Sequence, residues 1–215
     1  MKQFVVIGLG RFGSSVARTL VERDFDVLAL DIDEAAVQSL AEDVTHAVQA
    51  DATDENALSS LGLNNFDVAI VAIGSDIHAN ILATMILKEM GVRYIVAKAL
   101  NPLHGKVLAK VGADKIVYPE RDMGRRIALN LISSKVLDFI EFAPNYSIIE
   151  IKATKGMVGK TLTELQFRTR FGANVIALRA GERINISPSA SDEIKDGDVL
   201  VVLGKNSSLD KLKQV

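Results

Sequence analysis

The feature that most constrains the fold is a glycine-rich turn near the N-terminus. An apolar run at residues 4–7 precedes Gly-Leu-Gly-Arg-Phe-Gly at 8–13, and a helical pattern follows. This order of strand, glycine turn and helix is typical of a nucleotide-binding βαβ unit. We expect Gly8 to make the tight turn, Gly10 to let a phosphate approach the backbone, and Gly13 to let the helix pack against the strand. The alternative is that the glycines mark only a tight turn.

An acidic residue follows the second apolar run, at residues 27–30. Asp31 lies 18 positions after Gly13 (31 − 13), close to the spacing of about 20 at which an acid binds a ribose hydroxyl. A carboxylate there also repels a 2′-phosphate, which argues against NADP. The alternative is that Asp31 only caps the next helix.

The first 118 residues alternate strand and helix patterns. Short continuous apolar runs between helices indicate a parallel sheet that is covered on both faces. The expected strands are 4–7, 27–30, 46–50, 68–72, 94–97 and 115–118. The predicted fold class is therefore α/β, a Rossmann-like doubly wound sheet of order 3-2-1-4-5-6, with its crevice at the carboxyl ends of the strands.

The second part of the chain has a different pattern. A helix is expected from 119 to about 139. It is either a dimerising or exchanged helix or a cover for its own sheet. The segment 141–145 is expected to be a linker. Short strands follow, with a helical turn near 162–165 and a terminal helix from Ser207. The expected strands are 146–151, 174–178, 184–186 and 199–203. We predict a nucleotide domain at 1–140 and a small α+β domain at 146–215, which is near the size where one core is marginal and a partner copy helps.

Composition excludes several classes of function. The 25 basic and 27 acidic residues leave a net charge of −2, which does not predict a nucleic-acid partner. The chain has no cysteine, so disulfides and thiolate sites are excluded. The longest apolar runs, 68–73 and 199–203, are far shorter than the roughly 18–20 residues that span a bilayer. With no signal peptide expected, a cytoplasmic location is predicted.

Several motifs together resemble one known family. They are GLGRFG (8–13), LDID (30–33), VAIG (71–74), YPERDMG (118–124) and the stretch 159–188. Over essentially its whole length, the chain resembles the RCK or KTN family, the cytosolic regulatory subunits of Ktr/Trk-type potassium uptake systems. The resemblance implies a nucleotide-sensing ring, commonly of eight copies, that is attached to the inner face of the membrane through a membrane-embedded potassium-translocating subunit. It also implies that the first domain binds ATP or ADP to control gating, and some members of the wider family bind NAD or NADH.

Three charged residues are candidates for the phosphate end of the site. Arg11 lies inside the glycine turn, where it could form paired hydrogen bonds to a terminal phosphate, or it is a solvated surface arginine. Lys98 follows a strand and either reaches solvent or faces an anion. In the resembled family the acid that matches Glu120 lies near the terminal phosphate across the dimer interface, with a divalent or monovalent cation between them. The alternative for Glu120 is a favourable charge at the start of a helix.

The remaining candidates complete the predicted nucleotide site. Asp51, Ala52 and Thr53 match the family's adenine-side loop, although Asp51 or Thr53 could instead cap a helix. The full predicted site consists of Gly8, Gly10, Arg11, Phe12, Gly13, Asp31, Asp33, Asp51, Ala52, Thr53, Ile73, Gly74, Lys98 and Glu120.

The C-terminal domain has its own candidate site. In the family this module can bind cyclic di-AMP between two copies, through an arginine, an asparagine and apolar residues. Arg168, Asn174, Ile176 and Pro188 occupy the matching positions. The segment 168–172 reads equally well as a charged loop that closes a strand.

Nothing in the sequence predicts catalysis. The three histidines, His46, His78 and His104, lack the spacing of a shared metal site, and no lysine follows the glycines as in a Walker loop. An NAD-dependent oxidoreductase needs a proton donor in a substrate domain, but the C-terminal 75 residues contain no histidine. We therefore expect a binding protein that is not an enzyme. An NAD(H)-binding regulator and a free-standing sensor with no membrane partner are the competing interpretations.

Overall fold

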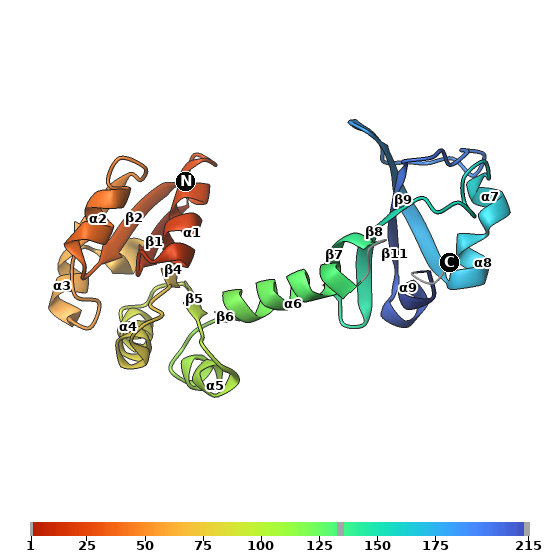
Figure 1. Cartoon of the computed structure of the whole chain (residues 1–215). Helices are drawn as coiled ribbons and strands as arrows, with labels where there is room; N and C mark the ends of the chain where they lie inside the picture. Colours follow the sequence, from red (N-terminus) through yellow and green to blue (C-terminus); the bar gives the residue numbers. More distant parts are fainter. Residues whose placement is uncertain (1, 133–135, 213–215) are drawn as a thin grey trace. The chain divides into compact units, whose positions relative to one another are not determined.

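The chain divides into two compact units, Met1–Glu120 and Arg121–Val215 (Figure 1). The computed structural model describes residues 2–132 and 136–212.

The first unit contains a six-stranded parallel sheet of order β3-β2-β1-β4-β5-β6. Its strands are β1 (Gln3–Ile7), β2 (Asp26–Asp31), β3 (His46–Gln49), β4 (Val68–Val71), β5 (Tyr94–Lys98) and β6 (Lys115–Val117). Its helices are α1 (Arg11–Val21), α2 (Glu34–Leu40), α3 (Glu55–Ser60), α4 (Ile77–Glu89) and α5 (Pro102–Lys110), with a short 3₁₀ helix η1 (Leu63–Asn65). The strand order and the doubly wound architecture confirm the fold predicted from the sequence.

Two apolar cores lie on opposite faces of this sheet. Successive side chains of a strand point to opposite faces, so Val5 and Ile7 of β1 join one core while Val6 joins the other. The first core includes side chains of α3, α4 and α5, and the second includes side chains of α1 and α2. This burial on both faces explains why the strands read as continuous apolar runs.

The second unit contains a five-stranded antiparallel sheet of order β10-β9-β11-β8-β7. Its strands are β7 (Val136–Ala143), β8 (Tyr146–Lys152), β9 (Ala173–Ala180), β10 (Arg183–Asn185) and β11 (Val199–Lys205). Its short helices are α7 (Leu162–Leu165), α8 (Phe167–Phe171) and α9 (Asn206–Leu212). Ile149 and Leu200 from the sheet and Leu209 from α9 belong to one apolar core. This arrangement confirms the predicted small α+β fold.

The long helix predicted from 119 to about 139 is wrong in its second part. Helix α6 (Pro119–Ile132) ends earlier, and residues 136–143 form strand β7. The sequence of β7 is rich in β-branched and aromatic residues, which favour strands, and it pairs with β8 along its length. The predicted linker 141–145 is also wrong, because it forms the end of β7 and a two-residue turn in which Asn145 has φ +66°.

The segment 168–172, for which a loop was one expectation, lies mostly within helix α8. The domain limits 1–140 and 146–215 stay a prediction, since the contact-based division falls at Glu120, within α6.

Helix α6 carries exposed apolar side chains. Met123, Ile127 and Leu131 are all exposed in the described chain. The predicted dimerising role of this helix stays a prediction. None of the helices in the described part of the chain has the length and apolar character needed to cross a membrane.

Candidate functional site

A pocket of about 630 Å³ lies at the carboxyl ends of strands β1 to β5. Of the residues predicted for the nucleotide site, all except Gly13 line this pocket. The topology therefore brings together residues that are more than 100 positions apart in the sequence, from Gly8 to Glu120. This volume falls within the usual range of small-molecule sites, about 300–1,000 Å³.

The three glycines of the turn have different roles in the structure. Gly8 has φ +93°, and a Cβ there would lie 2.8 Å from the backbone nitrogen of Ile73. Gly13 lies beneath the turn, and its Cβ would overlap the carbonyl oxygen of Gly8. A Cβ at Gly10 would meet no described atom within 4 Å. Gly8 and Gly13 are thus required by packing, whereas the open space at Gly10 faces a pocket that it lines.

Asp31 holds the glycine turn through its carboxylate. One carboxylate oxygen accepts a hydrogen bond from the backbone nitrogen of Leu9 at 2.6 Å, and the other accepts from that of Asp33 at 3.0 Å. Helix α2 is capped by Asp33, which accepts from the nitrogen of Ala35, so the alternative that Asp31 caps this helix is wrong. Each carboxylate oxygen has a second acceptor site, and the ribose contact of Asp31 stays a prediction.

The loop after β3 is ordered by a side chain that lines the pocket. Asp51 accepts hydrogen bonds from the backbone nitrogen of Thr53 at 2.8 Å and from its hydroxyl at 2.7 Å. These bonds lower the pKa of Asp51 below its usual value. Helix α3 is capped by Asp54, so the alternative that Asp51 or Thr53 caps it is wrong.

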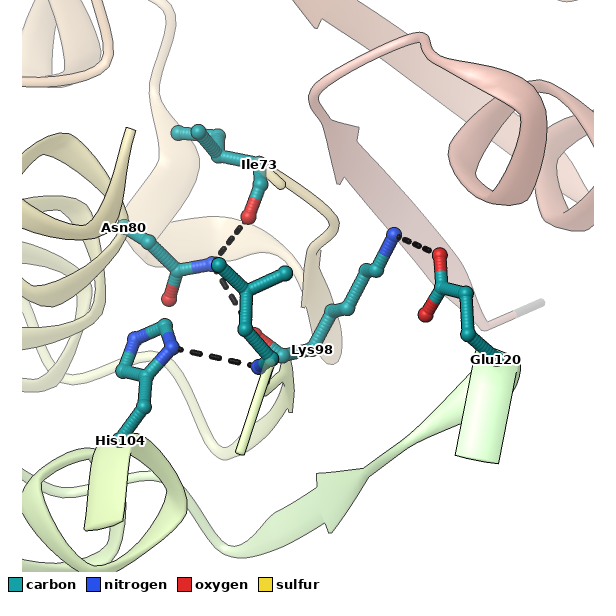
Figure 2. Close-up of polar contacts among 6 residues, drawn as sticks. Ile73, Asn80, Lys98, His104 and Glu120 are labelled. Carbon is teal, nitrogen blue, oxygen red and sulfur yellow. Dashed lines mark hydrogen bonds and ion pairs between the residues drawn. The ribbon is translucent and has the colours of Figure 1, made fainter. Parts of the chain in front are cut away.

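Lys98 faces an anion at the end of β5. Its Nζ lies 2.6 Å from the carboxylate of Glu120, the second residue of α6 (Figure 2). Lys98 is only 9% exposed, whereas the side chain of Glu120 is 64% exposed. The hydrogen bond from Lys98 lowers the pKa of Glu120, and the bond from the Glu120 backbone and the charge of Arg11 add to the shift. A Cβ at Gly74 would lie 3.2 Å from Nζ of Lys98, so the ammonium is held against that backbone.

Arg11 is the first residue of α1, at the end of a helix where backbone N–H groups lack intrahelical partners. It lines the pocket and is exposed. Its guanidinium has no hydrogen-bond or ion-pair partner among the described residues. It is thus available to an anion in the pocket.

Sequence reasoning missed several residues of this region. Asp76 lines the pocket and caps α4 by accepting from the nitrogen of Ala79. Asn80 is fully buried beneath the pocket rim and bonds to the backbone of Ile73 and Lys98. A polar amide among the mostly apolar residues of the helix 77–87 was the available signal. The other missed lining residues are Ile7, Leu9, Leu30, Ile32, Ala36, Ala50, Ala72, Ser75 and Ala79.

The predicted residues of the second unit are partly brought together. Nε of Arg168 donates to the side-chain oxygen of Asn174 at 2.6 Å. Ile176 lies two positions further along β9 and is 36% exposed. Pro188 lies in the segment that follows β10. Within residues 2–132 and 136–212, no cluster of three or more histidine, aspartate or glutamate side chains could hold a metal ion.

The fold and the pocket define a Rossmann-type binding protein with an appended antiparallel α+β unit. The TrkA-N domain family matches residues 4–119, and the TrkA-C domain family matches residues 146–215. The chain therefore belongs to the TrkA-N/TrkA-C, or RCK, family, as the motifs of the sequence predicted.

Similar proteins are potassium uptake proteins. The chain is 47% identical over 213 residues to the Ktr system potassium uptake protein C of Bacillus subtilis, covering 99% of this chain and 96% of that protein. It is 43% identical over 212 residues to the Ktr system potassium uptake protein A of the same organism, with the same coverage. Both relatives are named potassium uptake proteins, which is the class of protein, rather than an enzyme, that the sequence predicted.

A solved structure supports the fold. The GsuK RCK domain has a TM-score of 0.70 and 21% sequence identity, and the match covers 99% of this chain. The chain spans 47% of the length of that protein. At this level of identity the likeness establishes the fold.

Proposed function

We propose that this chain is a cytosolic regulatory subunit that senses adenine nucleotides for a Ktr-type potassium uptake system. It binds ATP or ADP in the pocket of the first unit and controls the flux of K⁺ through a membrane-embedded partner. The observation that carries the proposal is the convergence of Arg11, Lys98 and the open backbone of Gly10 on one pocket.

The pocket offers distinct features to the two ends of a nucleotide. Arg11 and Lys98 are suited to phosphate oxygens, because charge-assisted hydrogen bonds are among the strongest in proteins. Asp31 and the ordered loop at Asp51 are suited to the ribose and adenine. The neighbouring start of α1 adds its positive dipole end to the phosphate side.

A cation completes the charge balance in this proposal. The pocket contains two basic side chains, and its acidic side chains are Asp31, Asp33, Asp51, Asp76 and Glu120. A polyphosphate that binds Lys98 competes with Glu120 for its ammonium. The released carboxylate is then a hard oxygen ligand for a divalent or monovalent cation bridging to the phosphates.

A ligand can switch the assembly only through its different affinities for two states. ATP and ADP differ by one phosphate, so residues near the last phosphate carry the difference. We propose that copies of this chain form dimers and an octameric ring, with the exposed apolar residues Met123, Ile127 and Leu131 of α6 in contacts between copies.

The test is a titration of the full chain with ATP, ADP and NADH. Replacing Arg11 by alanine is expected to weaken ATP binding by about tenfold, the value of one hydrogen bond to a charged group. ADP binding should change by less than about threefold, which narrows the gap between the two nucleotides. The Arg11→Lys variant keeps the charge but loses the paired donors. Its ATP affinity should lie between those of the wild type and of Arg11→Ala.

Two results would contradict this proposal. Equal losses for ATP and ADP would remove Arg11 from the recognition of the last phosphate. Tighter binding of NADH than of either adenine nucleotide by the wild-type chain would favour the alternative, an NAD(H)-binding regulator.

We propose a second ligand site, for cyclic di-AMP, in the C-terminal unit. The observation in its favour is that the Arg168 guanidinium is held by Asn174 beside the exposed Ile176 on β9. Calorimetric titration with cyclic di-AMP should give binding that Arg168→Ala weakens by about tenfold. An Arg170→Ala variant, which leaves the bond to Asn174 in place, is the control. Absence of binding by the wild-type chain would refute this second site.

A further inference from the structure

The carboxyl ends of β4 and β5 are joined by one buried side chain. Asn80 of α4 is 0% exposed, and its Nδ2 donates to the carbonyl oxygen of Ile73 at 2.6 Å and to that of Lys98 at 3.2 Å (Figure 2). The paired register of the two strands extends to Val71 and Ala97. Asn80 thus bridges the two chain segments just beyond the last paired residues of β4 and β5.

The orientation of this amide is fixed by its partners. Both partners are carbonyl oxygens, which only accept hydrogen bonds, so the group that faces them must be the NH₂ of Asn80. Its Oδ1 is buried without a partner among the described residues. A buried unsatisfied acceptor costs free energy, about 1–3 kcal/mol. Stability alone therefore does not explain an asparagine here. Its two hydrogen bonds are better explained by the relative position of the two chain segments that they hold.

The two segments that Asn80 joins form one wall of the pocket. Ile73 and Gly74 follow β4, Lys98 ends β5, and all three line the pocket. The Lys98 side chain is packed, with 11% of its surface exposed, and its Nζ lies close to the Cα side of Gly74. Because the stem of Lys98 has little freedom, the position of its ammonium follows the position of the backbone to which Asn80 is bonded.

A second buried polar side chain supports the same segment from another helix. Nδ1 of His104, in α5, accepts a hydrogen bond from the backbone nitrogen of Leu100 at 3.4 Å (Figure 2). His104 is buried, and its Nε2 has no partner among the described residues. The carboxyl end of β5 is therefore held by Asn80 of α4 and by His104 of α5, and neither residue lines the pocket.

We propose that Asn80 is a positioning residue. It holds the carboxyl ends of β4 and β5 at the separation that allows the Lys98 ammonium to bind a phosphate group. This inference rests on the proposed function, because it assumes that an adenine nucleotide binds in this pocket. Asn80 acts through Lys98 and does not touch the ligand.

The test is a double-mutant cycle in the full chain. Asn80→Leu keeps the approximate size of the side chain and removes both hydrogen bonds, and Lys98→Met removes the ammonium. We expect Asn80→Leu alone to weaken ATP binding by about tenfold, the value of one displaced charge-assisted contact. In the Lys98→Met background, Asn80→Leu should change ATP affinity by less than about twofold, because the group through which it acts is gone.

Thr84 provides a matched control. It is fully buried one turn later in α4, and its hydroxyl donates to the carbonyl oxygen of Asn80 at 2.8 Å, within the helix. Thr84→Val removes one buried hydrogen bond from the same helix without touching the ends of β4 or β5. It should leave ATP affinity within about twofold of the wild-type value, since its loss is one of stability alone.

Each outcome decides the proposal. Equal losses from Asn80→Leu with and without Lys98, or an unchanged affinity in the folded Asn80→Leu variant, would overturn it. If Asn80→Leu does not fold, the same cycle is run with Asn80→Ser, whose hydroxyl donates one bond, and the same two outcomes apply.

A measurement without ligand separates this inference from the proposed function. Hydrogen exchange of the amides at 73–76 and 98–101 should be faster in the Asn80 variant than in Thr84→Val. Unchanged exchange in these segments would overturn the role of Asn80. If the wild-type chain binds none of ATP, ADP or NADH while this exchange effect is present, the proposed function fails and the tie between β4 and β5 stands.

Discussion

Two glycines of the first turn allow the effect of packing on stability to be separated from the effect of ligand approach on binding. In each case one methyl group is added. Gly10→Ala and Gly13→Ala are changes of the same size, three residues apart. A Cβ at Gly13 would overlap the carbonyl oxygen of Gly8, whereas a Cβ at Gly10 meets no described atom within 4 Å. We therefore expect the first variant to lose nucleotide binding but keep its fold, and the second to lose stability.

The expected magnitudes follow from the local geometry. Gly10 has φ −64° and ψ −176° at the N-cap of α1, which alanine adopts without strain, so the loss is that of a poorer cap, about 1 kcal/mol. Gly13 lies inside α1, where alanine would otherwise gain about 0.5–1 kcal/mol. Overlap with a backbone atom reverses this gain, because the turn or the helix must move, and the net loss should be about 3 kcal/mol.

Gly124 is the control for the effect of alanine in a helix. It lies in α6, and a Cβ there meets no described atom within 4 Å. Gly124→Ala should keep nucleotide affinity and gain about 0.5–1 kcal/mol in the free energy of unfolding.

The assay combines denaturant unfolding with ATP titration for all three variants. Gly10→Ala should weaken ATP binding by at least about tenfold, because its methyl group occupies space that we assign to a phosphate. Unchanged ATP affinity in a folded Gly10→Ala protein would refute the assignment of that space. Wild-type stability in Gly13→Ala would refute the packing argument.

Two further predictions concern pH and the second unit. Burial lowers the pKa of His104 below 6.5, so the unfolded chain binds this proton more tightly, and the free energy of unfolding should fall as the pH drops below 6.5 toward the folded-state pKa. In denaturant unfolding over a pH series, His104→Gln should flatten this part of the stability curve. The control His78→Gln, at a side chain that is 96% exposed, should leave the curve unchanged. A slope that survives His104→Gln would show that another group causes it. In the turn between β7 and β8, where Asn145 has φ +66°, Asn145→Ala should cost about 1 kcal/mol and Asn145→Gly should cost less, and equal stability of the two variants would show that the backbone there is not constrained.

The sequence was informative where a residue's role depends on its neighbours along the chain. The glycine turn, the six parallel strands and their order follow from local patterns and from the topology of doubly wound sheets. Lys98 could be assigned to the pocket because it directly follows four apolar residues of a strand. Its partner Glu120 opens the next long helix, so both positions follow from the strand ends.

Other features depend on pairing between distant segments. The apolar spacing of α6 at 123, 127 and 131 continues to Ile140, so periodicity gives no reason to end the helix at Ile132. The strand at 136–143 is set by its pairing with β8, which local patterns do not specify. The polar side chain of Asn80 could be seen in the sequence, but its role could not. Its partners are backbone carbonyls 7 and 18 positions away, and the sequence does not show which carbonyls lie near it.

If a nucleotide binds in this pocket as we propose, the ion pair of Lys98 and Glu120 explains how the pocket responds to the length of a phosphate chain. A pair with one largely exposed partner contributes little to stability, since water competes for the carboxylate. Replacing Glu120 by a phosphate as the partner of Lys98 therefore costs little free energy. The buried stem of Lys98 keeps the ammonium in place. The exchange leaves Glu120, at the start of α6, as a free carboxylate close to the new negative charge. Whether that carboxylate is repelled or bridged by a cation depends on how far the phosphates extend. Under the proposed function, a nucleotide that differs by one phosphate can thus change the forces on α6, which belongs to the second unit from Arg121 onward.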